Sequence, residues 1–231
     1  MKGLAIAASL AMCATVWAET PQERLRASAT VMNEIMQAPD KGIPQDLFDK
    51  ADCVIVIPGM KKGAFVVGGE YGKGFAECRE GTRSGWGGPS AVKLEGGSVG
   101  FQIGGESTDL ILLVMNKKGM DKLMGDKFAL GADASVAAGP VGRTASAETN
   151  VRMDAEILAW SRSKGVFAGL ALKGGVLKPD KDDNRTLYGR DVMAHDILSG
   201  TVKAPADGHA LSAALGKYSS TMPNSADRSK Q

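Results

Sequence analysis

The spacing of hydrophobic positions changes near residue 53. Before that point, apolar residues recur three or four positions apart, which predicts one buried face of a helix over residues 20–37. The apolar positions of this helix are Leu25, Ala29, Met32, Ile35 and Met36. Thr20 and Glu23 match a capping box, so we expect the helix to begin beside Thr20.

Beyond residue 53, short apolar and glycine-punctuated runs predict strands joined by brief connections. Short connections favour antiparallel pairing, and the lack of clean alternation in several runs indicates that both faces of the sheet are covered. The expected strands are 53–58, 64–71, 74–79, 91–94, 98–104, 110–115, 157–160 and 166–172, with a hairpin turn at Gly72-Lys73-Gly74. Further helices are expected at 44–50, near 120–124, at 191–198 and at 210–218.

These elements predict an α+β fold. The expected architecture is a single domain with an antiparallel, curved or barrel-like sheet and flanking helices. The domain is expected over residues 19–218 and is followed by a polar tail over 219–231, which we expect to be disordered.

The first eighteen residues resemble a signal peptide. Lys2 precedes an apolar region over 4–16, and cleavage is expected before Glu19. Leu10-Ala11-Met12-Cys13 offers a second route, because it resembles a lipobox that would leave a lipidated Cys13. Both routes predict export, either to the periplasm or medium or to a membrane as an anchored lipoprotein.

Charge and composition argue against a general attraction to polyanions. The chain has 28 basic and 26 acidic residues, and loss of Lys2 with residues 1–18 leaves a net charge of +1. A nearly neutral protein has no long-range attraction to nucleic acid, so we expect no nucleic-acid partner. Binding to an anionic surface would need a local basic patch.

Cys53 and Cys78 remain after cleavage before Glu19. An even number of cysteines in an exported protein raises the possibility of a disulfide. A meander of strands 52–57, 64–71 and 74–79 would place them on either side of the middle strand, about 9.6 Å apart, which exceeds the reach of a disulfide. This geometry favours free thiols and leaves the bridge as the alternative.

Catalytic and metal motifs are weak. Ser98 lies in a G-x-S-x-G pattern, but a strand-like run follows it, and neither His195 nor His209 has a spacing that pairs it with the serine. We therefore expect no enzyme, with a serine hydrolase as a remote alternative. No cofactor is expected apart from calcium, because four oxygen-bearing residues follow part of a calcium-loop pattern: Asp180, Asp182, Asn184 and Asp191.

A basic series surrounds the first predicted strands and could form an anion-binding rim. Its members are Lys61, Lys62, Lys73, Arg79, Arg83 and Lys93. Solvated turns are the alternative interpretation, because charged residues normally lie at the surface.

Several glycine-rich segments, in order, resemble the SYLF domain family. They are PGMKKGAFVVGGEYGKG (58–74), GWGGPSAVKL (85–94), GSVGFQIGGESTDLILLVMN (97–116), FALGADASVAAGPVGR (128–143), SRSKGVFAGLALKGGVL (161–177) and LYGRDV (187–192). The resemblance covers roughly residues 30–200 and implies a non-enzymatic domain that binds phosphoinositides or membranes.

By position, the resemblance points to the N-terminal helix and its neighbouring lysines for lipid contact. Leu25, Met32, Ile35 and Met36 would insert, while Lys61 and Lys62, with Lys73, Arg79 and Arg83, would meet acidic head groups. The implied partner is an anionic phospholipid or membrane surface; an exported bacterial member would not meet actin. The alternative is a structural or interaction module in which this helix is a permanent lid.

Overall fold

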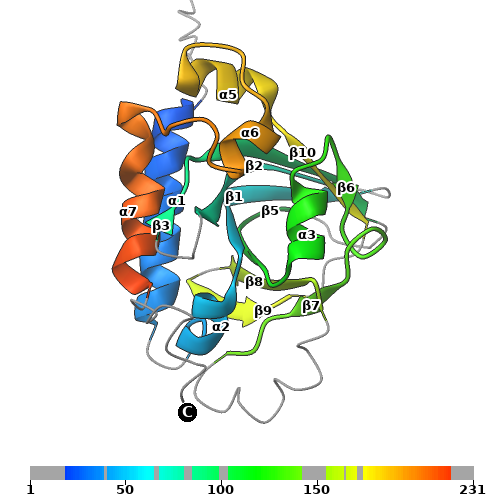
Figure 1. Cartoon of the computed structure of the whole chain (residues 1–231). Coiled ribbons are helices and arrows are strands. Elements are labelled where there is room, and N and C mark those ends of the chain that lie inside the picture. The colour runs from blue at the N-terminus through cyan, green and yellow to red at the C-terminus, as the bar shows by residue number, and fades with distance from the viewer. Residues whose placement is uncertain are drawn as a thin grey trace, which may run out of the picture.

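The computed structural model describes residues 19–38, 41–64, 68–80, 85–98, 104–141, 155–163, 165–170 and 174–219. Within these residues, the chain folds into a strongly curled mixed sheet with helices on both faces (Figure 1). The strands are β1 (Cys53–Ala64), β2 (Gly68–Glu80), β3 (Gly85–Trp86), β4 (Ser90–Ser98), β5 (Gly104–Val114), β6 (Phe128–Ala129), β7 (Val136–Ala138), β8 (Ile157–Ser163), β9 (Val166–Gly169) and β10 (Gly175–Pro179). The helices are α1 (Pro21–Gln37), α2 (Gln45–Lys50), α3 (Lys117–Leu123), α5 (Lys181–Tyr188), α6 (Ala194–Leu198) and α7 (His209–Tyr218), with a 3-10 turn at Ala206–Gly208.

The strands follow the order β6-β10-β4-β2-β1-β5-β8-β7, with β3 beside β2 and β9 beside β8. Neighbouring strands run antiparallel except β7 and β8, which are parallel. The sheet curls into a half-barrel, which confirms the predicted α+β class and curved sheet.

Two apolar layers cover the faces of the sheet. On the outer face, α1, α2 and α7 pack against the sheet residues Val54, Val56, Phe75, Ile111, Leu113 and Trp160. On the concave face, Leu123 of α3 and Leu198 of α6 belong to the cluster that contains Ile55, Ile57, Leu94, Leu110, Leu112 and Leu177. Alternate residues of β1 and β5 therefore point to opposite layers, which explains why residues 53–57 and 110–114 are apolar without interruption.

The predicted turn at Gly72-Lys73-Gly74 is wrong. These residues lie inside β2, and β1 continues through Pro58 and Gly59, where its register with β2 shifts by one residue. A Cβ atom at Gly74 would lie 1.9 Å from the carbonyl oxygen of Val56, so glycine is required there by the close approach of β1. Residues 65–67, between the two strands, lie outside the described part of the chain.

The expectation of free thiols is also wrong. Because β1 and β2 are neighbours, Cys53 lies directly opposite Cys78, with 4.0 Å between the Cα atoms, and the two form a disulfide. The error came from dividing the single strand β2 into two strands, which placed an extra strand between the cysteines.

Other differences concern element boundaries. Ser98 ends β4 and Gly104 begins β5, so most of the strand predicted over 98–104 lies outside the described residues. The acidic segment predicted as a loop forms helix α5, and β10 before it was not predicted. The end of the 166–172 prediction and all of the tail after residue 219 lie outside the described residues.

Candidate functional site

Helix α1 begins as its sequence predicts. The Thr20 hydroxyl accepts a hydrogen bond from the Glu23 amide at 3.2 Å, and the Glu23 carboxylate accepts one from the Thr20 amide at 2.8 Å. The amphipathic face turns inward: Leu25, Met32 and Ile35 have no exposed surface, and Met36 is partly buried. Three of the four residues expected to insert into lipid therefore lie in the core.

Ion pairs hold α1 near both ends. Arg24, near its start, lies 2.5 Å from an Asp183 carboxylate oxygen on α5. Glu34, near its end, pairs with Arg162 on β8, which also contacts Asp109 at 2.6 Å. Insertion of α1 into a membrane would have to break these contacts and expose its buried face. That insertion stays a prediction.

Two members of the basic series, Lys73 and Arg79, make contacts that stabilise the fold. The Lys73 ammonium lies 2.6 Å from an Asp180 oxygen and 3.2 Å from an Asp183 oxygen. Burial disfavours the charged form, but the two carboxylates outweigh it and raise the pKa of Lys73. Arg79 donates to the carbonyl oxygens of Ala51 and Phe48 at 3.0 and 3.2 Å.

The other members are more dispersed. Lys61 is exposed and lies opposite Tyr71, whose side chain is 46% exposed, so an accessible cation and an aromatic ring share one surface. Lys93 is partly buried, about 4.0 Å from Glu95. Lys62 lies in β1, but its side chain is outside what the structure describes; Arg83 and Cys13 are wholly outside it.

The residues of the calcium pattern lie in helix α5 or close to its ends. Asp180 is the N-cap of α5 and accepts from the Asp183 amide, while Asp182 lies in the first helical turn. Asn184 is buried, and Asp191 contacts Arg185 at 2.6 Å. Among the described residues, no group of three or more His, Cys, Asp or Glu side chains is arranged to hold a metal. Calcium binding stays a prediction.

Ser98 is the last residue of strand β4. His195 lies on α6, and His209 begins α7. Residues 99–103, which would form a nucleophile turn after Ser98, lie outside the described part of the chain.

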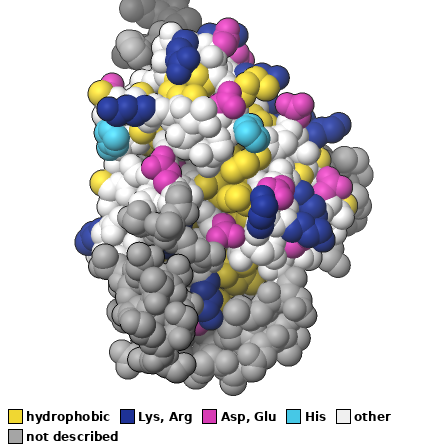
Figure 2. All heavy atoms as spheres, viewed as in Figure 1, with side chains coloured by type: hydrophobic (Ala, Val, Ile, Leu, Met, Phe, Trp, Pro, Cys, Tyr) yellow, Lys and Arg dark blue, Asp and Glu magenta, His cyan; other side chains and the backbone are white. Residues whose placement is uncertain are grey.

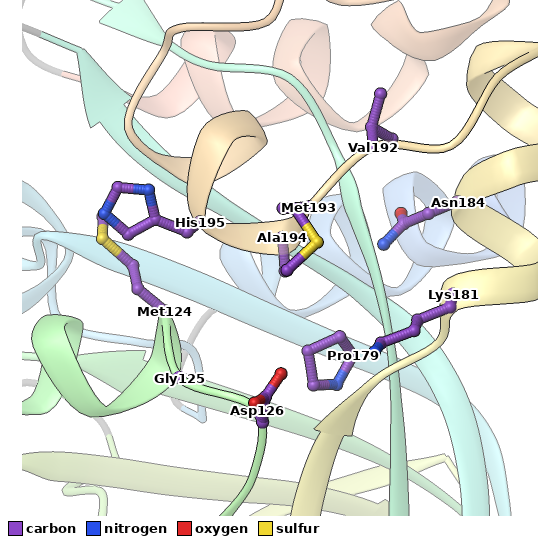
Figure 3. A pocket seen from close by; sticks show the side chains of 10 residues that line it. All are labelled: Met124, Gly125, Asp126, Pro179, Lys181, Asn184, Val192, Met193, Ala194 and His195. Atoms are coloured by element: carbon purple, nitrogen blue, oxygen red, sulfur yellow. The ribbon is translucent and has the colours of Figure 1, made fainter.

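A different surface opens at the concave face, between α3 and α6; we call it the α3–α6 groove. Figure 2 shows hydrophobic side chains gathered along the middle of this face, with charged side chains beside them. Its mouth is lined by Met124, Gly125, Pro179, Met193, Ala194 and His195 (Figure 3). Its floor is lined by Val92, Leu123, Phe128, Leu177, Ala194 and Leu198. Shared residues make the mouth and the floor continuous.

The mouth combines apolar and charged groups. Met193 is 55% exposed, the largest exposed fraction among the described large hydrophobic residues. Lys181 and Asp126 line the same pocket, together with the imidazole of His195. The pocket holds about 30 Å³, which is room for a water-sized group.

Ion pairs fix the α3 wall of the groove. Lys118 and Lys122 lie 2.7 and 3.0 Å from the carboxylate of Glu156, which precedes β8. The hydrogen bond from Lys118, with help from Lys122, lowers the pKa of Glu156 to about 2 despite its burial. The carboxylate is therefore ionised at neutral pH and ties α3 to the sheet.

The groove was not predicted from the sequence. Its lining comes from α3, β4, β6, β10, α5 and α6, which are far apart along the chain. Methionine and alanine in short helices carry no signal that separates a groove from an ordinary core. Met193 is the one local signal for the groove. It lies immediately before α6, two residues from His195, and an apolar residue at such a helix start can be exposed.

Comparisons with known proteins agree with the glycine-rich pattern. A family model described as "Ysc84: Las17-binding protein actin regulator" matches residues 95–218. SH3 domain-containing YSC84-like protein 1 of Rattus norvegicus is 34% identical over 181 residues, which cover 78% of this chain and 53% of that protein. The protein of the same name from Homo sapiens is 32% identical over 191 residues, covering 82% and 55%.

A yeast relative extends the comparison. LAS seventeen-binding protein 3 of Saccharomyces cerevisiae is 33% identical over 188 residues, covering 79% of this chain and 40% of that protein. The chain thus spans about half the length of the curated relatives it matches, and these relatives carry the names of SH3-containing or binding proteins rather than enzymes. The match to the family model and the identity over most of the chain place this protein in the Ysc84 family, which is defined by the SYLF domain.

Proposed function

We propose that this protein is a non-catalytic module of the bacterial cell envelope that binds anionic lipid through the α3–α6 groove. The observation that carries the proposal is the mouth of the groove, where the exposed Met193 lies in one pocket with Lys181 and His195. An apolar side chain beside the Lys181 ammonium suits an amphiphile with an acidic head group, because each part of the lipid finds a matching neighbour.

The groove is a better candidate than the buried face of α1 because it requires no element to leave the core. Met193 can contact lipid from its present position, whereas Leu25 and Met32 have no exposed surface. Lys61, with Tyr71 opposite, offers a second surface of cation and aromatic ring. A phosphoinositide head group is one acidic ligand within this proposal.

Binding to vesicles tests the proposal. The purified protein is expected to co-sediment with phosphatidylglycerol vesicles at low salt and to be released as salt screens the cations. Phosphatidylcholine vesicles are the matched control and should retain much less protein. No binding to phosphatidylglycerol at any salt concentration would contradict the proposal.

A second candidate function is a protein-interaction module without lipid binding. The ion pairs of Arg24 and Glu34 favour it, because they hold α1 as a permanent lid. Binding of Las17 is described for the family model. Vesicle binding separates the two candidate functions. A purely protein-binding module would show no preference for phosphatidylglycerol over phosphatidylcholine vesicles.

Export is part of the leading proposal. Residues 1–18 have the pattern of a signal peptide, and the Cys53–Cys78 disulfide suits an oxidising compartment. Intact mass of the protein recovered from the cell envelope tests this directly. Cleavage before Glu19 and lipidation at Cys13 give different masses, and an uncleaved chain in the cytosol would overturn export.

None of the helices in the described residues combines the length and apolar character needed to cross a membrane.

A further inference from the structure

Two buried polar groups face the α3–α6 groove without a partner. The Ser90 hydroxyl lines the floor and the Asn184 side chain lines the mouth; both residues are at most 1% exposed. Within the described part of the chain, the Ser90 Oγ and Asn184 Nδ2 atoms have no hydrogen-bond partner. Buried polar groups are normally paired, so both point to a missing acceptor.

The orientation of the Asn184 amide follows from its neighbour. The backbone N–H of Ala91 donates to Asn184 Oδ1 at 2.7 Å, and an N–H cannot accept a hydrogen bond. The Nδ2 group is therefore the end left free, and it can only donate. Figure 3 shows the amide of Asn184 pointing from α5 toward Met193 and Ala194.

The two groups lie next to each other in the fold. Ser90 directly precedes Ala91 on β4, and the Ala91 amide is the group that Asn184 of α5 contacts, so the two side chains approach the groove near the start of β4. Lys181, which begins α5, adds a cation at the mouth. Because Asp126 lines the same mouth and offsets the charge of Lys181, the two buried hydrogen-bond donors are the feature that suits an oxygen anion.

The surroundings exclude a fully hydrated anion. Apart from Ser90 and Lys178, which pairs with Glu95 at 2.6 Å, the floor is apolar; its side chains include Leu123, Phe128, Leu177 and Leu198. A ligand that satisfies the donors and also covers this floor must join an oxygen anion to a hydrocarbon chain. Charge complementarity at one end and apolar burial at the other thus define an amphiphile.

We propose that the α3–α6 groove binds a fatty acid, with its carboxylate on Asn184 Nδ2 and Ser90 Oγ and its chain along the apolar floor. This inference rests on the proposed lipid-binding function and specifies the class of lipid. The mouth holds about 30 Å³ and the floor has no free space, so the groove must widen to admit the chain. Met124 and Met193 form its cover, and methionine side chains rearrange easily because they are unbranched and have three rotatable bonds.

Nuclear magnetic resonance tests the assignment. In the ¹⁵N-labelled protein, dodecanoate is expected to move the side-chain NH₂ signals of Asn184 downfield in a saturable manner. Dodecyltrimethylammonium has the same chain without an acceptor oxygen and is expected to leave these signals nearly unmoved. Equal shifts with both amphiphiles, or no shift with dodecanoate, would overturn the assignment and leave a buried water as the partner.

Substitutions at the two donors give an independent readout. Ser90→Ala removes an unpartnered hydroxyl and is expected to keep the fold while weakening dodecanoate affinity about fivefold, the usual effect of one lost hydrogen bond. The control is Ser107→Ala, which removes an exposed hydroxyl on β5 and should leave affinity unchanged. Asn184→Asp keeps the acceptor for Ala91 but replaces the donor, so it is expected to abolish binding. Unchanged affinity in Ser90→Ala and Asn184→Asp would overturn the proposal.

The outcomes also separate this inference from the broader function. A protein that binds phosphatidylglycerol vesicles while dodecanoate leaves Asn184 unmoved would retain the lipid-binding function and lose the fatty-acid site. Under that result, a diacyl lipid at the membrane surface would be the ligand. If the protein binds neither phosphatidylglycerol vesicles nor dodecanoate, both the lipid-binding function and the fatty-acid site are contradicted.

Discussion

Glu77 carries a carboxyl group buried between β2 and the helices of the outer face. It has no exposed surface, and both carboxyl oxygens lack a hydrogen-bond partner in the described part of the chain. Burial raises the pKa of Glu77 well above its ordinary value of 4.5, an effect that the backbone of Ser212 offsets only in part. Burial, with a contribution from the charge of Glu77, also raises the pKa of Tyr188.

The raised pKa makes stability depend on pH. Above pH 4.5 the unfolded chain releases the Glu77 proton while the folded protein holds it, so stability falls as the pH rises toward the raised value. Glu77→Gln is expected to increase the free energy of unfolding at pH 8 by at least about 1 kcal/mol and to have little effect near pH 4. Urea unfolding at both pH values measures this.

Glu80→Gln is the control for that experiment, because Glu80 is exposed on the same strand. It should leave the pH dependence of unfolding unchanged. If the two variants have the same pH dependence as the unsubstituted protein, Glu77 does not carry the buried proton.

The disulfide is the second prediction at the residue scale. Cys53 and Cys78 are 25 residues apart, so the bridge restricts the unfolded chain and is expected to contribute about 3 kcal/mol to stability. The double variant Cys53→Ala, Cys78→Ala should unfold at a clearly lower urea concentration than the oxidised protein. An unchanged midpoint would show that the two cysteines are not bridged in solution.

Helix α1 is the element for which the two alternatives, a permanent lid and a membrane-inserting helix, predict different behaviour. As a permanent lid, it keeps its buried face against the sheet and its ends paired through Arg24 and Glu34. Hydrogen exchange is therefore expected to show strong protection of the amides between Leu25 and Ile35, unchanged by phosphatidylglycerol vesicles. Loss of that protection upon vesicle addition would favour insertion of α1.

Some elements follow from local sequence alone. The Thr20–Glu23 cap and the apolar spacing identify α1 because both signals act within a few residues. The apolar run from Leu110 to Val114 also identifies β5 and its two buried faces. These predictions needed no knowledge of distant residues.

Other elements depend on contacts that the sequence does not display. Gly72 and Gly74 resemble turn glycines, but they accommodate the bulged strand β1 across the sheet. The acidic run after Asp180 resembles a loop, although Asp180 caps a helix and binds Lys73. The groove is assembled from six separate elements, so no local pattern predicted it.

At the scale of the whole molecule, the two faces of the half-barrel differ. Long helices α1 and α7 lie side by side on the outer face and are joined by the Tyr218 hydroxyl, which donates to Asn33 at 2.9 Å (Figure 1). The concave face is covered by the short helices α3 and α6, between which the groove opens. This asymmetry is the reason to expect ligand contact on the concave side.

Paired substitutions of exposed residues test that expectation most directly. Met193, at the groove, and Val166, on β9, are 55% and 51% exposed, so glutamate at either position should be tolerated by the fold. Binding of each variant to phosphatidylglycerol vesicles is measured by co-sedimentation. Met193→Glu places an anion at the mouth and is predicted to weaken binding about tenfold or more, whereas Val166→Glu should bind like the unsubstituted protein. Equal binding by both variants would contradict the claim that the α3–α6 groove contacts lipid.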